Sequence, residues 1–175
     1  FQCWAGGKGV WDVSRYVGGG GIQAAWAGAA QVACVDSSAG AIDWVHRNAR
    51  RNGLDNVETI EGEAFEALKA LAEEKEKFDV VVLDPPALIP RRRDQKAGEE
   101  AYARLNQLGL RLLERDGILV SASCSMHLSQ EKLIDIIRGS GRKIDRFVQL
   151  LEQGHQAPDH PVIPGIPETD YIKSC

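Results

Sequence analysis

Residues 78–90 read FDVVVLDPPALIP, a strand-length apolar run followed by an acidic residue and two prolines. Residues 80–83 are apolar without interruption, as in a strand that is buried on both faces. Asp84 then stands at the end of the strand, where Pro85 and Pro86 stiffen the turn and remove two backbone donors. The carbonyl groups left free beside a carboxylate predict a place that holds a planar base or amine.

Apolar runs of strand length alternate with helical patterns along most of the chain. We expect strands at about 8–14, 31–36, 56–60, 78–83 and 117–123. We expect helices at about 20–29, 38–52, 63–76, 97–114 and 129–140. This alternation predicts an α/β fold with a doubly wound, mostly parallel sheet that helices cover on both faces.

Local chemistry supports the expected helix ends and marks a loop near the C-terminus. Ser37 or Ser38 can cap the helix at 38–52, and Asn52-Gly53 ends it. Residues 154–167 contain four prolines and little periodicity, which predicts a loop. Residues 168–174 are the candidate for a final strand.

Composition and charge restrict the class of protein. The 175 residues are 43% apolar and 26% charged, which suits one globular domain with a substantial core. No stretch has the length and hydropathy of a membrane span, and no signal peptide is recognisable. The net charge of −4 argues against a protein wholly coated by nucleic acid, although it leaves room for a local basic patch.

The cysteines are scattered and show no C-x-x-C spacing. This pattern argues against a zinc site and against a disulfide scaffold, and it favours a reducing, cytoplasmic location. No His and Cys cluster has the spacing of metal ligands, so we expect no metal. The four cysteines are Cys3, Cys34, Cys124 and Cys175.

In a doubly wound sheet, ligands bind beyond the carboxyl ends of the strands. The first strand provides Asp12 and is followed by the glycine run 18–21, which would let the backbone approach a ligand closely. The run is not G-x-G-x-x-G and lies too far from Asp12 for a dinucleotide fingerprint, so a nicotinamide cofactor is disfavoured. Taken alone, the run is equally consistent with a Gly-rich turn that binds nothing.

Two further strands lead into acidic residues. Asp36 can accept both hydroxyl protons of a ribose, although an Asp here would also cap a helix. Glu63 or the backbone of Ala64 can meet the edge of a purine, although an acidic first helical turn explains Glu63 better by itself. Together with Asp84 and the glycine run, these residues resemble a class I S-adenosylmethionine-dependent methyltransferase.

Six segments carry a closer resemblance, to the bacterial 23S ribosomal RNA cytosine-C5 methyltransferases. It covers nearly the whole chain in order, and its most specific part is the pair Asp-Pro-Pro and Ser-Cys-Ser. The segments are YVGGGGIQAAWAGAAQVACVDSS (16–38), NARRNGL (48–54), FDVVVLDPPAL (78–88), GILVSASCSMHLS (117–129), EQGHQAPDHPV (152–162) and PETDYIK (167–173).

The resemblance implies a Rossmann-like sheet with a reversed last strand, adenosylmethionine as methyl donor and 23S ribosomal RNA as partner. Pro86 would complete the turn that faces the base, and Cys124 would be the nucleophile. The family also has a PUA domain and a middle domain, so we expect residues 1–175 to be the catalytic domain of a longer protein. The implied cofactor residues are Asp12, Tyr16, Gly18, Asp36, Ser37, Glu63, Ala64, Asp84 and Pro85.

A cysteine suits this chemistry because cytosine C5 is a poor nucleophile. Addition of a thiolate at C6 breaks the conjugation of the ring and makes C5 enamine-like. An acid such as Asp84 can hold or protonate N3, where charge develops. Cys124 could instead be a small apolar residue buried in the core, but its placement at a strand end and the resemblance favour the nucleophile. We interpret Cys34, in the middle of a strand, as such a core residue.

Two polar groups are candidates for substrate binding. Arg91, Arg92 and Arg93 follow the Asp-Pro-Pro turn and suit phosphates, although a solvated loop explains them equally well. The resemblance places His155, Asp159 and His160 near the active site, whereas without it they are a surface loop with an Asp-His pair. A homodimer is a further expectation.

We therefore expect an RNA cytosine-C5 methyltransferase of the EC 2.1.1 class. A methyltransferase for another RNA position or an amino group would also use Asp-Pro-Pro but would need no cysteine. A non-catalytic domain that binds adenosylmethionine or RNA is the alternative of a different class. A nicotinamide oxidoreductase is the weakest alternative, because it explains neither Asp-Pro-Pro nor Cys124.

Overall fold

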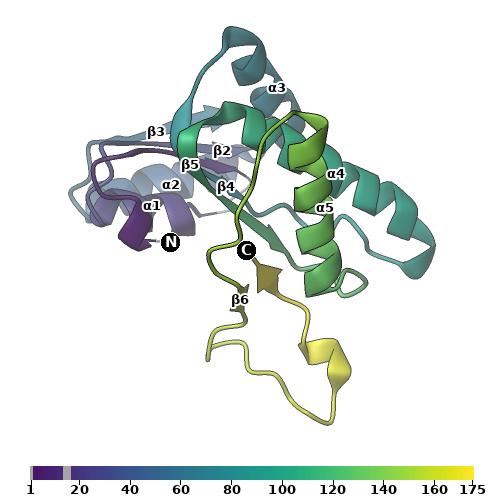
Figure 1. Ribbon diagram of the computed structural model, residues 1–175. Helices are drawn as coiled ribbons and strands as arrows, with labels where there is room; N and C mark the ends of the chain where they lie inside the picture. The colour runs from purple at the N-terminus through teal and green to yellow at the C-terminus, as the bar shows by residue number, and fades with distance from the viewer. Residues whose placement is uncertain (1, 14–16) are drawn as a thin grey trace. The chain divides into compact units, whose positions relative to one another are not determined.

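The computed structural model describes residues 2–13 and 17–175. In this part of the chain a seven-stranded sheet has the order β3-β2-β1-β4-β5-β7-β6 (Figure 1). The strands are β1 (Gly9–Val13), β2 (Gln31–Asp36), β3 (Val57–Glu61), β4 (Phe78–Leu83), β5 (Leu113–Ser123), β6 (Gly154–His155) and β7 (Lys173–Ser174). The α-helices are α1 (Gly19–Trp26), α2 (Ala39–Arg51), α3 (Ala64–Glu74), α4 (Gln95–Leu112) and α5 (Gln130–Lys143). Short 3-10 helices are η1 (Gln2–Trp4), η2 (Arg92–Asp94) and η3 (Pro167–Thr169).

The chain forms two compact units. The first unit comprises residues 1–84 and 108–120, and the second unit comprises residues 85–107 and 121–175. The expected strands and helices up to residue 143 are confirmed, with ends that differ by a few residues.

The first unit contains the parallel part of the sheet. β1 pairs in parallel with β2 on one side and with β4 on the other, and β3 continues the sheet beyond β2. Valine dominates these strands because a β-branched side chain suits a pleated, buried surface. Small helical residues complete the packing. The buried cluster includes Val10, Val32, Val80, Val82, Ala24 and Ala25.

Helix α2 has the ends that its sequence predicts. The Ser38 side chain accepts a hydrogen bond from the Ala41 amide at 3.3 Å, so Ser38 and not Ser37 is the N-cap. Asn52 is the C-cap residue, and Gly53 adopts a positive φ of 65°.

Strand β5 begins four residues earlier than the expected start at 117. Helix α4 ends at Leu112 and the strand follows at once, with Asp116 at φ 62° inside it. A Cβ added at Gly117 would lie 3.0 Å from the Asp79 carbonyl oxygen of β4. Glycine at this position therefore allows β5 and β4 to approach closely where the expected strand begins.

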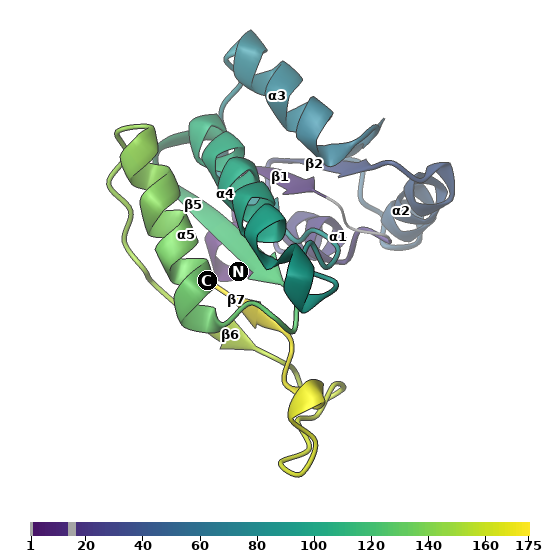
Figure 2. The same ribbon diagram turned by 90° about the vertical axis from the view of Figure 1, so that its right-hand side faces the viewer.

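The second unit contains α5, most of α4 and the reversed end of the sheet. Helices α4 and α5 lie side by side (Figure 2), and Ser140 Oγ donates to the Ala103 carbonyl at 3.1 Å. Strand β7 runs antiparallel to β5 and to β6, which confirms the expected reversed strand. The apolar core of this unit is formed by Ile89, Tyr102, Leu128 and Leu133.

The final strand is shorter than the expected 168–174. Helix η3 occupies its beginning, and the Tyr171 and Ile172 amides both donate to Gln156 Oε1, at 2.8 and 3.2 Å. These two amides therefore donate hydrogen bonds to a side chain and not to the backbone of a neighbouring strand. Conversely, the short strand β6 forms at the start of the segment that we expected to be a loop.

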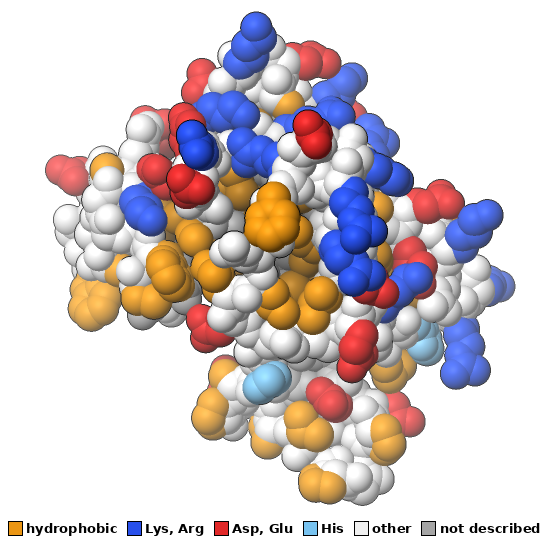
Figure 3. Space-filling model, viewed as in Figure 1, with side chains coloured by type: hydrophobic (Ala, Val, Ile, Leu, Met, Phe, Trp, Pro, Cys, Tyr) orange, Lys and Arg blue, Asp and Glu red, His pale blue; other side chains and the backbone are white. Residues whose placement is uncertain are grey.

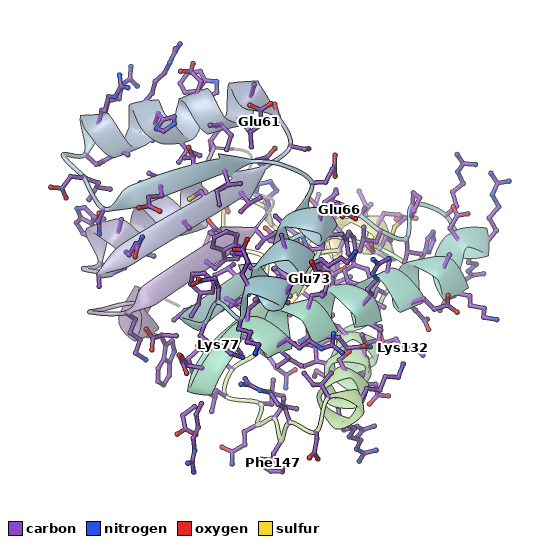
Figure 4. The ribbon with its side chains drawn as sticks, turned by 90° about the horizontal axis from the view of Figure 1, so that it is seen from above. Glu61, Glu66, Glu73, Lys77, Lys132 and Phe147 are labelled. Atoms are coloured by element: carbon purple, nitrogen blue, oxygen red, sulfur yellow. The ribbon has the colours of Figure 1, made fainter. Side chains whose placement is uncertain are left out.

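Two segments of the second unit expose apolar side chains. Val162, Ile163 and Ile166 on the C-terminal loop are each 45–47% exposed. Figure 3 shows hydrophobic side chains at the surface of this face of the molecule. Phe147 is 88% exposed and projects from the segment after α5 (Figure 4). These side chains lie outside the core of the unit.

Candidate active site

The carboxyl ends of the parallel strands meet at one edge of the first unit. Val13 at the end of β1 pairs with Val35 of β2 and with Leu83 of β4. Asp36 and Asp84 each follow the residue that pairs with Val13, so the two carboxylates stand one step beyond β1, on its two sides. This is the arrangement that the strand-end pattern of the sequence predicts.

The glycine run forms a tight turn into α1. Gly18 has a positive φ of 74°, and the Asn48 side chain of α2 donates to the Val17 carbonyl at 3.1 Å. A Cβ added at Gly18 would lie 2.8 Å from a methyl group of Val45. The turn is therefore held by α2. Asn48, from the NARRNGL segment, is a positioning residue that the sequence did not identify.

Asp12 serves the framework of this turn. Its side chain is fully buried, and its Oδ2 accepts the Gly21 amide at 2.6 Å. A Cβ at Gly21 would lie 2.4 Å from the Cys34 sulfur, and one at Gly20 would lie 3.0 Å from Asp12 Oδ2. Packing therefore requires glycine at position 21 and leaves little room for a Cβ at position 20. By contrast, Gly19 is exposed and has open space around it, which leaves room for a ligand at the N-terminus of α1.

Tyr16 lies outside the described residues. Asp36 is half-buried, and its Oδ1 accepts the Ser38 amide at 2.9 Å, while Ser37 is exposed. Since Ser38 is the cap of α2, Asp36 is not needed for that task. Within the described part of the chain, no hydrogen bond engages Asp36 Oδ2.

The end of β3 places a further carboxylate beside Asp36. Glu61 pairs with Asp36 across the two strands and is exposed. Glu63 is exposed at the N-cap of α3 but makes no side-chain cap bond there, and Ala64 is half-buried. Asp36 was singled out because an acidic residue stands at the end of a strand. The same pattern is present at Glu61, the last residue of β3.

In the second unit, the Ser-Cys-Ser segment is anchored from beneath by a tyrosine. The hydroxyl of the fully buried Tyr102 lies 2.8 Å from Ser123 Oγ and 2.9 Å from Ser125 Oγ. Ser123 and Ser125 are buried, whereas Cys124 between them is partly exposed. The serine hydroxyls are therefore used to fix the backbone on both sides of the thiol.

The same network reaches the segment after Asp-Pro-Pro. The Ile89 amide donates to Ser125 Oγ at 3.1 Å, and Ile89 belongs to the core cluster that contains Tyr102. Pro85 is buried and Pro86 is exposed. The turn that begins at Pro85 and the segment that contains Cys124 are thus joined within one unit.

Lys173 is a further residue of the second unit that the sequence did not identify. It is only 7% exposed, and its Nζ donates to the Ser125 carbonyl at 2.7 Å and to the Leu128 carbonyl at 2.6 Å. Burial lowers the pKa of Lys173, while the charges of Asp170 and Cys124 act to raise it. Lys173 lies in the PETDYIK segment, but no local sequence pattern indicates that its side chain would bind the Ser125 and Leu128 carbonyls.

The candidate substrate residues lie on exposed segments of the second unit. Arg91, Arg92 and Arg93 are exposed at η2. Asp159 Oδ2 and His160 Nδ1 form the expected pair, at 3.4 Å, and both side chains are exposed. His155 pairs across β6 and β7 with Lys173, which in turn pairs with Ser123 of β5. These registers bring His155, but not the arginines, into one row with the end of β5.

The described residues contain no candidate metal site and no candidate membrane span. No group of three or more His, Cys, Asp or Glu side chains there could hold a metal ion. Among the same residues, no helix combines the length and apolar character that crossing a bilayer requires.

Relatives with known names match almost the whole chain. A Methanocaldococcus jannaschii protein, provisionally named a ribosomal RNA large subunit methyltransferase, is 40% identical over 95% of this chain and 43% of its own length. Ribosomal RNA large subunit methyltransferase I of Klebsiella pneumoniae is 35% identical over 95% of this chain and 42% of its own length. The chain thus spans less than half the length of these relatives.

Solved structures and a family model agree on the fold. The crystal structure of SMU.776, a provisionally assigned methyltransferase complexed with SAH, has a TM-score of 0.84 at 20% identity and covers 97% of this chain and 44% of that chain. This likeness confirms the expected class I methyltransferase fold. The family model described as "Methyltransferase domain" matches residues 18–160, and the chain therefore belongs to the methyltransferase-domain family.

Proposed function

We propose that this protein transfers a methyl group from S-adenosylmethionine to C5 of a cytosine in 23S ribosomal RNA, through a covalent adduct with Cys124. The observation that carries the proposal is the anchoring of the Ser-Cys-Ser segment. Tyr102 binds both flanking serines, so the backbone around one partly exposed thiol is fixed at a strand end. A cysteine that only filled space would not need this support.

The residues of the first unit fit the proposed cofactor. Asp36 and Asp84 stand beyond β1 on its two sides, the space at Gly19 is open, and Asp36 offers an oxygen suited to ribose hydroxyls. Asp12 and Asn48 would act indirectly, by holding the glycine turn in shape. Adenosylmethionine, when bound, supplies the methyl group.

The proposed chemistry of the chain's own residues is nucleophilic catalysis. Cys124, as a thiolate, forms the S–C6 bond, and the π electron pair of C5–C6 is displaced toward N3 and O2. We assign Asp84 to protonate or hold N3, on its position at the end of β4 and on the resemblance. After methylation, water accepts the C5 proton, the C5–H electron pair restores the C5–C6 double bond, and the S–C6 electron pair leaves with the Cys124 sulfur.

The substrate class rests on the relatives. Those at 35% and 40% identity carry names that specify ribosomal RNA of the large subunit. Arg91–Arg93 and the loop with His155, Asp159 and His160 are the proposed contacts to RNA. The target base must be unstacked or single-stranded before its C6 is accessible. A cytoplasmic location belongs to the same proposal.

The test uses the full-length protein, labelled adenosylmethionine and unmodified 23S RNA that contains 5-fluorocytosine. Fluorine at C5 blocks the final elimination, so a covalent protein–RNA adduct should accumulate. The adduct should persist in Cys3→Ser, which removes an exposed thiol elsewhere, and disappear in Cys124→Ser. Methyl transfer without an adduct would contradict the proposal and favour an amino group or another RNA atom, whereas no binding of adenosylmethionine would favour a non-catalytic domain.

A further inference from the structure

Lys173 is a buried cation whose hydrogen-bond partners are neutral. It is 7% exposed, and Nζ donates to two carbonyl oxygens, those of Ser125 and Leu128. A buried ammonium is costly unless an anion compensates its charge. An ammonium also has three donors, so two carbonyls leave one N–H for a further partner.

The sheet register places Lys173 beside the residue that precedes Cys124. Lys173 pairs directly with Ser123 across β7 and β5, and Cys124 is the next residue along the chain. The amine also binds the carbonyl of the residue after Cys124. The groups whose charge acts on Lys173 are Asp170, on the segment before β7, and Cys124 itself.

We propose that Lys173 is a positioning residue that holds Cys124 as a thiolate and fixes the backbone that presents it. This inference rests on the proposed function, in which the Cys124 sulfur attacks C6. The proton of the thiol goes to water, and the ammonium of Lys173 stabilises the remaining negative charge without exchanging a proton with it. The S–C6 bond then forms from the sulfur electron pair, and the same pair returns to sulfur at the final elimination.

The expected effect is large enough to measure. A free cysteine has a pKa of about 8.5, so only a few per cent is thiolate near pH 7. A cation within a few ångström lowers such a pKa by about one to three units. Loss of the cation should therefore reduce the thiolate fraction at pH 7 by about tenfold or more.

The experiment measures the reactivity of Cys124 without RNA or methyl donor. The full-length protein is alkylated with iodoacetamide between pH 5 and 10, and mass spectrometry follows the peptide that contains Cys124. Lys173→Met should raise the pH midpoint by at least about one unit, whereas Lys173→Arg, which keeps the charge, should restore most of the shift. An unchanged midpoint in folded Lys173→Met would overturn the inference.

A reciprocal measurement covers the case in which Lys173→Met does not fold. In Cys124→Ser, a nearly isosteric change, the pKa of Lys173 followed by NMR of its side chain should fall, because an anion beside it has been removed. An unchanged pKa of Lys173 would refute the coupling. An adduct on fluorinated RNA together with an uncoupled Cys124 would overturn this inference and leave the proposed function intact, whereas a coupled Cys124 that forms no adduct would overturn the proposed function alone.

Discussion

Replacement of Tyr102 by Phe tests whether the Ser-Cys-Ser segment is held from beneath. The change removes one hydroxyl from a fully buried ring and with it the contacts to Ser123 Oγ at 2.8 Å and Ser125 Oγ at 2.9 Å. Each hydrogen bond contributes about 0.5–1.5 kcal/mol, so the free energy of unfolding should fall by about 1–3 kcal/mol. Both serines keep one bond, because Ser125 Oγ still accepts from Ile89 and Ser123 Oγ from the Ser125 amide.

Urea denaturation measures this loss directly. With a denaturant slope of about 2 kcal/mol/M, the midpoint should decrease by about 0.5–1.5 M. A double-mutant cycle with Ser125→Ala should give a coupling of about 0.5–1.5 kcal/mol, because the two variants remove the same bond. A loss below about 0.5 kcal/mol, the usual range of surface substitutions, or strictly additive effects would refute the proposed anchor.

Three further outcomes follow from the geometry. Gly21→Ala should destabilise the fold by about 1–3 kcal/mol in thermal unfolding, because its Cβ would lie 2.4 Å from the Cys34 sulfur. A second change, Cys34→Ala, should recover part of the lost stability. The control variant Gly19→Ala should be nearly neutral, because the space around Gly19 is open. Burial raises the pKa of Cys175 to about 11. The contribution of the neutral thiol to the free energy of unfolding is therefore intact below pH ~9 and is lost as the pH rises toward 11. Cys175→Ala should remove this pH dependence of the free energy of unfolding, measured by urea denaturation at several pH values. Replacement of Arg91–Arg93 by Ala should lower the slope of log K against log salt for RNA binding by about 2–3, and an unchanged slope would exclude phosphate contacts there.

The strand ends could be predicted from the sequence because they depend on local pattern and on one general rule. Apolar runs located β2 and β4 to the residue, and the parallel arrangement then placed Asp36 and Asp84 at a common edge. The rule says where a residue stands in the sheet but not what its side chain binds. Asp12 and Asp36 were therefore treated alike, although Asp12 is buried and holds the Gly21 amide.

The supports of the site could not be predicted, because they join distant parts of the chain. Tyr102 looks like an ordinary core residue of a helix, and only the packing of α4 in the second unit brings its hydroxyl to Ser123 and Ser125. Asn48 likewise looks like a polar residue of an exposed helix, yet it holds the carbonyl that precedes the glycine turn. Local periodicity contains no information about such contacts.

The reversed last strand gives a geometric reason for the position of the C-terminal segment. Because β7 runs antiparallel to β5, its first residue pairs with the last residue of β5, as Lys173 does with Ser123. A parallel strand in this place would bring its own carboxyl end to that edge and carry its preceding loop to the opposite one. The reversed direction therefore places Lys173, and the loop before it, at the end of β5. Strand β6 adds His155 to the same row. The His155 backbone is about 10 Å from that of Ser123, which is two strand spacings. A sheet built only from parallel units would need a separate insertion to bring a buried cation and a loop with histidines to the residue that follows Ser123.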